Sequence, residues 1–388
     1  MSTAGKVQYV VHYLPTDENK PITCKAAVTW KIGGGFSIET VEVAPPKKGE
    51  VRIRMTSTGV CHSDLHVMEG IDKDWPFPGV LGHEGAGIVE SVGEGVTSVV
   101  PGDTVVLVFE AYCGTCDFCK DPRTCMCKTQ TRNHLQLDGT SRITCKGQPI
   151  AQMSTISTFS QYTVTNEINV AKVNPKANPK TLGLAGCCIP TGYGAVMNAG
   201  KVPPGSTCAV WGLGGVGMCV LMGCRDSGAS KIIGIDTNPN KFPLAKEFGA
   251  TDFLNPKDVD NVPEKLAEMT NGGVDFCFVS VGITPVMEQA FMSSHPQWGK
   301  TVIIGLADIG ETMKAGIWEL IYGRQLVGTF YGSYKARLGI PQLVDKVVSG
   351  QIQLEKLISH RLPLEKISEG FNMLKTGESL RAIIDFSL

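Results

Sequence analysis

The 388-residue chain lacks several features that would identify whole classes of protein. It contains no uninterrupted apolar stretch approaching the ~20 residues that a membrane-spanning helix needs. Basic and acidic residues nearly balance, at 36 and 37, and no basic block is present. Because binding to nucleic acid or to an anionic membrane depends on clustered positive charge, we expect neither as a partner.

The N-terminus also lacks the pattern of a secretory signal, since no continuous apolar run or small-residue cleavage site follows its charged residues. Cysteine, by contrast, is plentiful, with 14 residues. Without a signal peptide, so many thiols indicate a reducing compartment, where they bind metal or stay free. We therefore expect a cytoplasmic protein, and the length indicates two domains or one large domain with an insert.

Four of the cysteines follow one another at the spacing C-x2-C-x2-C-x7-C, namely Cys113, Cys116, Cys119 and Cys127. Thiolates two residues apart can turn back on one ion, and four of them complete a tetrahedral zinc shell that leaves no position for water. The spacing therefore predicts a structural zinc. Cys125 could replace Cys127 as the fourth ligand, and a cluster of unliganded thiols is the alternative.

The first half of the chain has the character of short β-strands. Residues 51–55 alternate apolar and polar side chains, as a half-buried strand does. Glycine-punctuated strands are expected at 82–93 and 102–108, and another at 160–164. These features predict a β-rich, barrel-like domain.

From about Gly205 the pattern changes to strands that alternate with helices. Strands are expected at 208–211, 231–236, 274–279, 301–305 and 325–330, and helices from the glycine turn to Asp226 and over 240–248. This alternation predicts a doubly wound parallel sheet, so the fold class is α/β. The tail, 331–388, is mixed again and is expected to rejoin the first domain.

The segment from Gly212 to Gly217 has the form G-x-G-x-x-G, follows an expected strand and opens an expected helix. In this context Gly212 permits a tight turn, Gly214 lets the backbone approach a pyrophosphate, and Gly217 lets helix and strand pack closely. Asp236 ends the next strand and can accept hydrogen bonds from ribose hydroxyls. Its charge would repel a 2′-phosphate, which favours NAD over NADP. Lys241 is expected near the same ribose, although a solvated lysine is equally compatible with its position.

A second concentration of metal-binding residue types lies at Cys61 to His66, with His83-Glu84 about 20 residues further on and Cys187-Cys188 before the nucleotide segment. Two thiolates and one imidazole with an open fourth position have the composition of a catalytic zinc site. Spacing alone leaves this undecided, because a histidine is more often a core residue and a buried cysteine more often an apolar filler.

Several motifs occur together and in order: Gly59-Val-Cys-His-Ser-Asp, Gly82-His-Glu-Gly, the cysteine run, Gly186-Cys187, Thr191-Gly-Tyr-Gly, the glycine turn and Ser379-Leu-Arg381. They resemble the medium-chain zinc-dependent alcohol dehydrogenases of animal type, from about Ile22 to the C-terminus. The resemblance implies a β-rich GroES-like catalytic domain, formed by 1–188 and 332–388, and a Rossmann coenzyme domain over 189–331. It also implies two zinc ions per subunit and NAD.

The resemblance assigns roles residue by residue. Cys61, His83 and Cys187 correspond to the catalytic zinc ligands, with Asp64 bonded to His83 and Glu84 behind the metal, partnered by Arg381. Ser63 and His66 correspond to a proton relay. The residues that correspond to coenzyme contacts are His62, Thr191, Gly212, Gly214, Gly217, Asp236, Lys241 and Arg381, and those that correspond to the substrate pocket are Phe109, Met153, Leu306 and Phe330.

The resemblance implies oxidation of a primary or secondary alcohol to an aldehyde or ketone. One alternative is an S-(hydroxymethyl)glutathione dehydrogenase, although Thr131 stands where that branch carries arginine. A catalytically silent structural homologue, as in the eye lens, is a second alternative. By analogy we expect a homodimer joined at a sheet edge near 301–305 or 317–320. Residues 8–21 form an insertion relative to the family, to which we assign no function.

Overall fold

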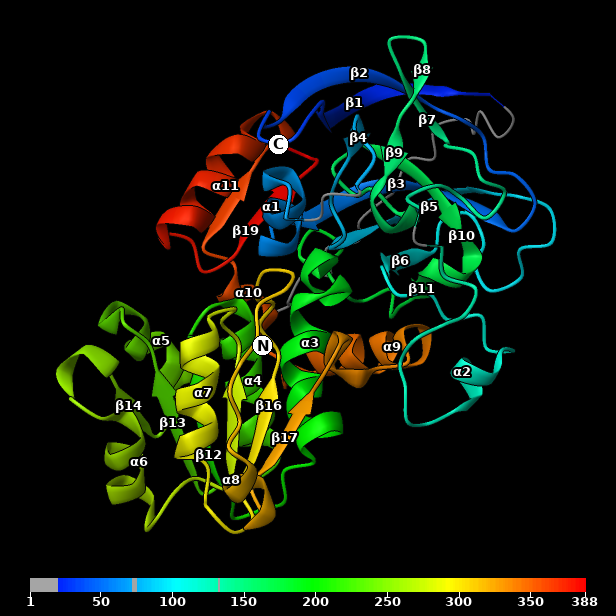
Figure 1. Cartoon of the computed structure of the whole chain (residues 1–388). Helices are drawn as coiled ribbons and strands as arrows, with labels where there is room; N and C mark the ends of the chain where they lie inside the picture. The colour runs from blue at the N-terminus through cyan, green and yellow to red at the C-terminus, as the bar shows by residue number, and fades with distance from the viewer. Residues whose placement is uncertain (1–19, 72–74, 132) are drawn as a thin grey trace, which may run out of the picture.

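The computed structural model describes residues 20–71, 75–131 and 133–388, which form a β-rich lobe and an α/β lobe (Figure 1). The predicted fold class is confirmed. Most of the insertion at 8–21 lies outside the described residues. The helices begin and end as follows: α1 (His62–Glu69), α2 (Asp117–Lys120), α3 (Cys188–Gly194), α4 (Gly215–Asp226), α5 (Phe242–Glu247), α6 (Val262–Thr270), α7 (Thr284–Ser293), α8 (Ile317–Ile321), α9 (Ala336–Val348), α10 (Leu354–Leu357) and α11 (Ile367–Thr376).

Two sheets of the described residues build the β-rich lobe. One has the order β8-β7-β2-β1-β4-β9, and the other β11-β6-β5-β3-β19-β18, with β10 paired to β3. Their strands are β1 (Ile22–Thr29), β2 (Ser37–Val43), β3 (Glu50–Gly59), β4 (Gly79–Val80), β5 (Gly85–Val92), β6 (Thr104–Leu107), β7 (Ile143–Cys145), β8 (Gln148–Pro149), β9 (Ala151–Gln152), β10 (Tyr162–Asn166), β11 (Val170–Lys172), β18 (His360–Leu362) and β19 (Ala382–Asp385).

Strand β3 lies at the centre of the second sheet and is more buried than its sequence indicates. It pairs with β5, β10 and β19, so both of its edges are paired with other strands. Arg52, which the alternation places on the polar side of a half-buried strand, is 0 % exposed. Its Nε donates to Glu90 Oε2 at 2.5 Å, which compensates the buried charge. The prediction of a half-buried strand is therefore wrong at this residue.

The tail of the chain returns to the β-rich lobe, as the sequence predicts. Strand β19 pairs antiparallel with β3, with Ile383 opposite Gly59. In Figure 1 the red tail lies beside the blue strands of the N-terminal region. This return brings Arg381 next to residues more than 290 positions earlier in the chain.

The α/β lobe is built on one parallel sheet with the order β14-β13-β12-β15-β16-β17. Its strands are β12 (Thr207–Trp211), β13 (Lys231–Ile235), β14 (Asp252–Leu254), β15 (Phe276–Val279), β16 (Lys300–Ile303) and β17 (Gln325–Gly328). The order reverses at β12, which is the place where doubly wound sheets bind ligands. The domain limits at 188/189 and 331/332 stay predictions.

The expected dimer edge needs correction. Strand β16 pairs on both sides, with β15 and β17, so 301–305 is not a sheet edge. Residues 317–321 form the helix α8 and not a strand. The exposed edge at this end of the sheet is β17.

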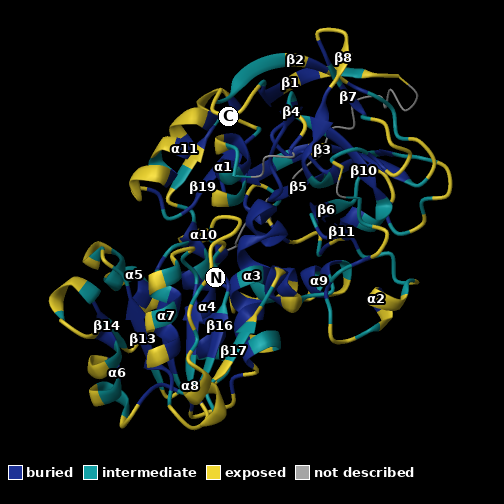
Figure 2. Ribbon diagram, in the orientation of Figure 1, coloured by how far each residue is buried: buried dark blue, intermediate teal, exposed yellow. Residues whose placement is uncertain are grey.

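A shared core fixes the two lobes against each other. The largest buried cluster runs from Val210 of β12 through Tyr193 of α3 to Val106 of β6. Figure 2 shows this interior as continuous dark blue around α3 and α4, with exposed residues on the outer helices. Within the described residues, no helix is long and apolar enough to cross a membrane.

Candidate active site

Three residues far apart in sequence meet beside α3. Cys61 precedes α1, His83 lies between β4 and β5, and Cys187 precedes α3. The ligand atoms of these residues and of Glu84 all lie within 4.8 Å of one another, and all four residues are buried. The crossing of β3, β5 and α3 therefore assembles the donor set that the sequence left undecided.

Asp64 fixes the orientation of the His83 ring. Its Oδ1 lies 3.1 Å from His83 Nδ1 and accepts the Gly82 N–H at 2.8 Å. Nε2 of His83 is buried and has no hydrogen-bond partner among the residues that the structure describes. A carboxylate on one ring nitrogen leaves the other as a metal ligand, which is the usual arrangement at zinc sites.

The electrostatics of this cluster favour a cation. A hydrogen bond with Cys187 lowers the pKa of the Cys61 thiol well below its ordinary value, although burial opposes this. Burial lowers the pKa of His83, but the charges of Asp64 and Cys61 outweigh it and raise that pKa well above its ordinary value. Two thiols, an imidazole and a carboxyl, all buried and close together, thus fit a zinc ion.

The relay candidates lie on α1 next to the cluster. The Ser63 hydroxyl is 3.9 Å from Cys61 Sγ, and His66 follows it by three residues, so both lie on neighbouring positions of the helix surface. Both are half-buried, and His62 is exposed at the start of the helix. Thr191 Oγ1 lies 3.8 Å from Cys187 Sγ, on α3.

Glu84 and Arg381 form a fully buried ion pair behind the cluster. Burial raises the pKa of Glu84 to about 7, although the Arg381 charge lowers it. The aliphatic part of Arg381 lies against Gly215 at the first turn of α4. The same side chain therefore contacts both the metal-ligand region and the nucleotide turn.

The glycine turn has the geometry that the motif requires. Gly212 has φ +89°, where side chains are strained. A methyl group on Gly217 would overlap the Gly212 carbonyl oxygen, so helix and turn touch there. A methyl on Gly214 would meet nothing within 4 Å. This open space at the N-terminus of α4 is where a pyrophosphate can approach the backbone.

Asp236 faces the same turn. Its Oδ2 accepts the Leu213 N–H at 2.8 Å and a Lys241 Nζ–H at 3.0 Å, and its Oδ1 accepts the Asn238 N–H. The structure thus brings both residues of the expected ribose site together. It also adds an ion pair between them that the sequence did not indicate.

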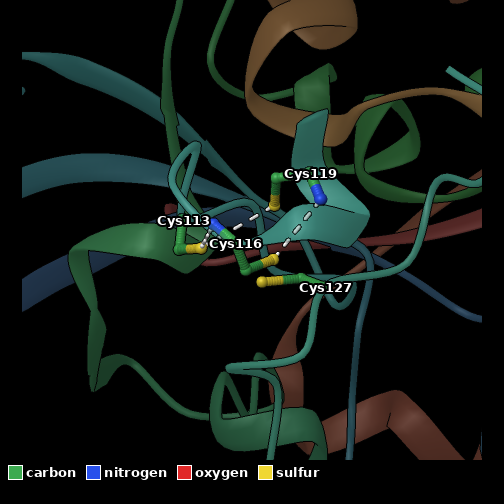
Figure 3. Close-up of side chains that lie close together, drawn as sticks. All are labelled: Cys113, Cys116, Cys119 and Cys127. Atoms are coloured by element: carbon green, nitrogen blue, oxygen red, sulfur yellow. Dashed lines mark hydrogen bonds between the residues drawn. The ribbon is translucent and has the colours of Figure 1, made fainter. Parts of the chain in front are cut away.

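The four cysteines of the run lie together in the segment 113–127, which we call the four-cysteine lobe or cysteine lobe (Figure 3). Their sulfur atoms lie within 4.8 Å of one another, which fits a tetrahedral zinc shell. Cys119 N donates to Cys116 Sγ at 3.3 Å, which favours the thiolate form. Cys125 is not in the cluster: its Sγ–H donates to the Phe330 carbonyl at 3.2 Å. Cys127 is therefore the fourth member.

The pocket candidates divide into two groups. Phe109 stacks edge-to-face on His83, with centroids 5.5 Å apart, and on Phe330 at 5.7 Å. Met153 is buried in the core of the β-rich lobe. Leu306 is exposed.

Sequence reasoning missed Tyr331, which is buried and lies 4.8 Å from Phe109, centroid to centroid. Its backbone has φ +55°, which a bulky residue rarely adopts. The only signal in the sequence is its place in the run Phe330-Tyr331-Gly332, and that run fits a simple turn equally well.

Comparison with known proteins agrees with this geometry. Residues 47–175 match the family model described as alcohol dehydrogenase GroES-like domain, and residues 215–349 the one described as zinc-binding dehydrogenase. Among solved structures, an alcohol dehydrogenase zinc-binding domain protein from Burkholderia ambifaria is 34% identical with a TM-score of 0.89, covering 94% of this chain and 99% of that chain.

Benzyl alcohol dehydrogenase from Acinetobacter calcoaceticus is 31% identical with a TM-score of 0.86, at the same coverage. The 2R,3R-butanediol dehydrogenase from Bacillus subtilis is 26% identical with a TM-score of 0.73, covering 93% of this chain and 99% of that chain. Fold and site together define a zinc-binding, nucleotide-dependent oxidoreductase. The chain belongs to the medium-chain zinc-dependent alcohol dehydrogenase family.

Proposed function

We propose that this protein oxidises small primary or secondary alcohols to aldehydes or ketones with NAD, and that it holds one catalytic and one structural zinc ion per subunit. The observation that carries the proposal is the buried His83 Nε2, which no described residue bonds and which lies among Cys61, Glu84 and Cys187. When bound, zinc supplies Lewis-acid chemistry and NAD supplies the hydride acceptor.

The side chains around the metal ligands have separate tasks. Asp64 keeps the His83 ring in one tautomer through its contact with Nδ1. Ser63 takes the proton of the alcohol and passes its own to His66, which is half-buried and delivers it to solvent. The rings of Phe109 and Phe330 exclude water from the reacting atoms.

The choice of NAD rests on Asp236. Its carboxylate accepts two backbone N–H groups as well as the Lys241 ammonium, so it is held at the ribose position. A fixed carboxylate accepts hydrogen bonds from two ribose hydroxyls and repels a 2′-phosphate. Clearly better turnover with NADP would contradict this assignment.

The test is a kinetic panel of ethanol, octanol, benzyl alcohol and formaldehyde, the last with and without glutathione, run with NAD and then NADP. We expect NADH formation from simple alcohols. Activity only with formaldehyde plus glutathione would identify the glutathione-dependent alternative, and no activity on any substrate would favour the structural homologue. His66→Gln with unchanged turnover near neutral pH would remove His66 from the relay.

A matched pair of variants tests the metal site. Cys61 and Cys24 are 7% and 8% exposed, so both are buried cysteines of the β-rich lobe. Cys61→Ala should lose one zinc and all turnover but still bind NADH. Cys24→Ala should keep its zinc content and its turnover. Equal activity of the two variants would refute a catalytic role for Cys61.

We also propose a homodimer joined through β17 and α8. Several large apolar side chains of this region are exposed, namely Ile309, Ile317, Trp318, Ile321 and Tyr322. Exposed apolar side chains next to the outermost strand of a sheet favour association with a second copy. Light scattering after size-exclusion chromatography should give twice the chain mass, and Trp318→Glu should give the monomer. A wild-type monomer at micromolar concentration would overturn this.

A further inference from the structure

The segment from Thr329 to Lys335 connects β17 to α9 and is attached at both ends to the four-cysteine lobe. Near its start, Cys125 Sγ–H donates to the Phe330 carbonyl at 3.2 Å. At its end, Lys335 Nζ donates to the Phe118 carbonyl at 2.6 Å and the Asp121 carbonyl at 2.7 Å. Figure 1 shows α9 and α2 beside each other at this contact.

The placement of Lys335 is unusual for a lysine. It is the N-cap residue of α9, where the helix dipole disfavours a cation. Its ammonium instead reaches carbonyl groups at the C-terminal end of α2, where a cation is favourable. The two short charge-assisted bonds therefore hold this residue against the cysteine lobe.

The backbone between these attachment points needs support. Tyr331, Gly332 and Ser333 have φ values of 55°, 59° and 57°, which places three successive residues in the left-handed region. Such conformations persist only where the surroundings hold them. Asn198 Nδ2 donates to the Gly332 carbonyl at 2.9 Å, and the Thr329 N–H donates to the Ile303 carbonyl at 3.1 Å. The cysteine lobe adds the attachments at Phe330 and Lys335.

The same lobe also carries the other half of the pocket wall. Phe109 stands four residues before Cys113, and its ring packs on both Phe330 and Tyr331. It contacts His83 on its other side. Phe109, which contacts His83, and Phe330, which contacts Phe109, are thus both joined to the cysteine lobe. Phe109 is joined through the chain, and Phe330 through Cys125 and Lys335.

We propose that Cys125 and Lys335 are positioning residues, through which the four-cysteine lobe sets the shape of the substrate pocket. This inference rests on the proposed oxidation of alcohols for its substrate readout. The lobe thereby has a role besides stability: it determines how closely Phe330 approaches Phe109, and so which sizes of alcohol fit beside the metal.

The experiment compares Cys125→Ala, Cys125→Ser and Lys335→Met with wild type in the zinc-loaded full-length protein. Cys145→Ala is the matched control, since Cys145 is also buried and donates a long contact to a carbonyl, that of Thr40 in β2, and not to the segment 329–335. Three readouts are taken: zinc per subunit, amide hydrogen exchange of peptides over 329–335, and the ratio of kcat/KM for octanol to that for ethanol.

We expect two zinc ions in every variant. Exchange over 329–335 should be faster in Cys125→Ala and Lys335→Met and unchanged in Cys145→Ala. The octanol-to-ethanol ratio should change by about 3-fold in Cys125→Ala and about 10-fold in Lys335→Met, with an unchanged KM for NAD. Cys125→Ser, which keeps a donor, should move back toward wild type.

Exchange and substrate ratios equal to wild type in both Cys125→Ala and Lys335→Met would overturn the inference. So would a matching change in Cys145→Ala, because it would show a general loss of packing. If wild type oxidises no alcohol, the proposed function fails. The exchange comparison then still decides whether Cys125 and Lys335 hold the segment.

Discussion

Alanine at Gly214 or at Gly217 should separate coenzyme binding from folding, although the two residues belong to one motif. A methyl group on Gly217 would overlap the Gly212 carbonyl oxygen, so α4 must move away from the turn. Overpacking of this kind costs about 1–3 kcal/mol. For a lobe of this size that lowers the Tm by about 2–10 °C.

Gly214→Ala should have the opposite profile. Its φ is −83°, which alanine adopts without strain, and the added methyl meets no atom within 4 Å. Removing a glycine from an unstrained position leaves stability unchanged or raises it by up to about 1 kcal/mol. The methyl would, however, occupy the space through which a pyrophosphate reaches the N-terminus of α4, so affinity for NADH should fall about 10-fold or more.

Two measurements on each variant decide the matter: the Tm from calorimetry and the dissociation constant from NADH fluorescence. The expected result is a crossed pattern, in which Gly217→Ala loses stability and Gly214→Ala loses binding at wild-type stability. Wild-type affinity in Gly214→Ala would refute the location of the pyrophosphate. An unchanged Tm in Gly217→Ala would refute the close contact between α4 and the turn.

Three further predictions concern metal and charge. Cys127→Ser should leave one zinc per subunit by mass spectrometry, and loss of neither ion would exclude Cys127 as a ligand. Asp64→Asn removes the charge that orients His83, so the affinity for catalytic zinc should fall about 10–100-fold in a chelator competition. Arg52→Met leaves the Glu90 carboxylate unpaired and should lower the free energy of unfolding by about 3 kcal/mol in urea. Arg52→Met with Glu90→Leu should recover most of it, and an equal loss in the double variant would show that the pair is not the cause.

Periodicity and glycine spacing carried most of the fold prediction, because both depend on local geometry. The strand before Gly212, the helix to Asp226 and the strand at 231–235 are where the alternation placed them. The glycine motif fixed the role of Gly217 because close contact leaves no room for a side chain. Local spacing also found the four-cysteine lobe, whose ligands lie within 15 residues of one another.

Features that depend on contacts between distant segments could not be predicted from the sequence. Arg52 belongs to an alternating strand, and only the folded chain shows that it is buried and bonded to Glu90, 38 residues further on. The cysteine spacing could not decide whether Cys125 or Cys127 completes the cluster, because the choice depends on a contact of Cys125 with a distant residue. Cys125 bonds the carbonyl of Phe330, which lies more than 200 residues later in the chain. The predicted edge of the parallel sheet was wrong for the same reason. That β17 lies outside β16 depends on the order of strands in the folded sheet, which the sequence does not show.

Arg381 explains a glycine that the dinucleotide motif does not require. In G-x-G-x-x-G the residue after Gly214 is free to vary. Here a methyl group on Gly215 would overlap the Arg381 side chain and lie 3.2 Å from Cys188 Sγ. Arg381 in turn needs that space to pair with Glu84 behind the metal ligands. The glycine at 215 is therefore required by the metal site and not by the nucleotide, because Arg381, just before the last strand, lies against the first turn of α4 and pairs with the buried Glu84 carboxylate.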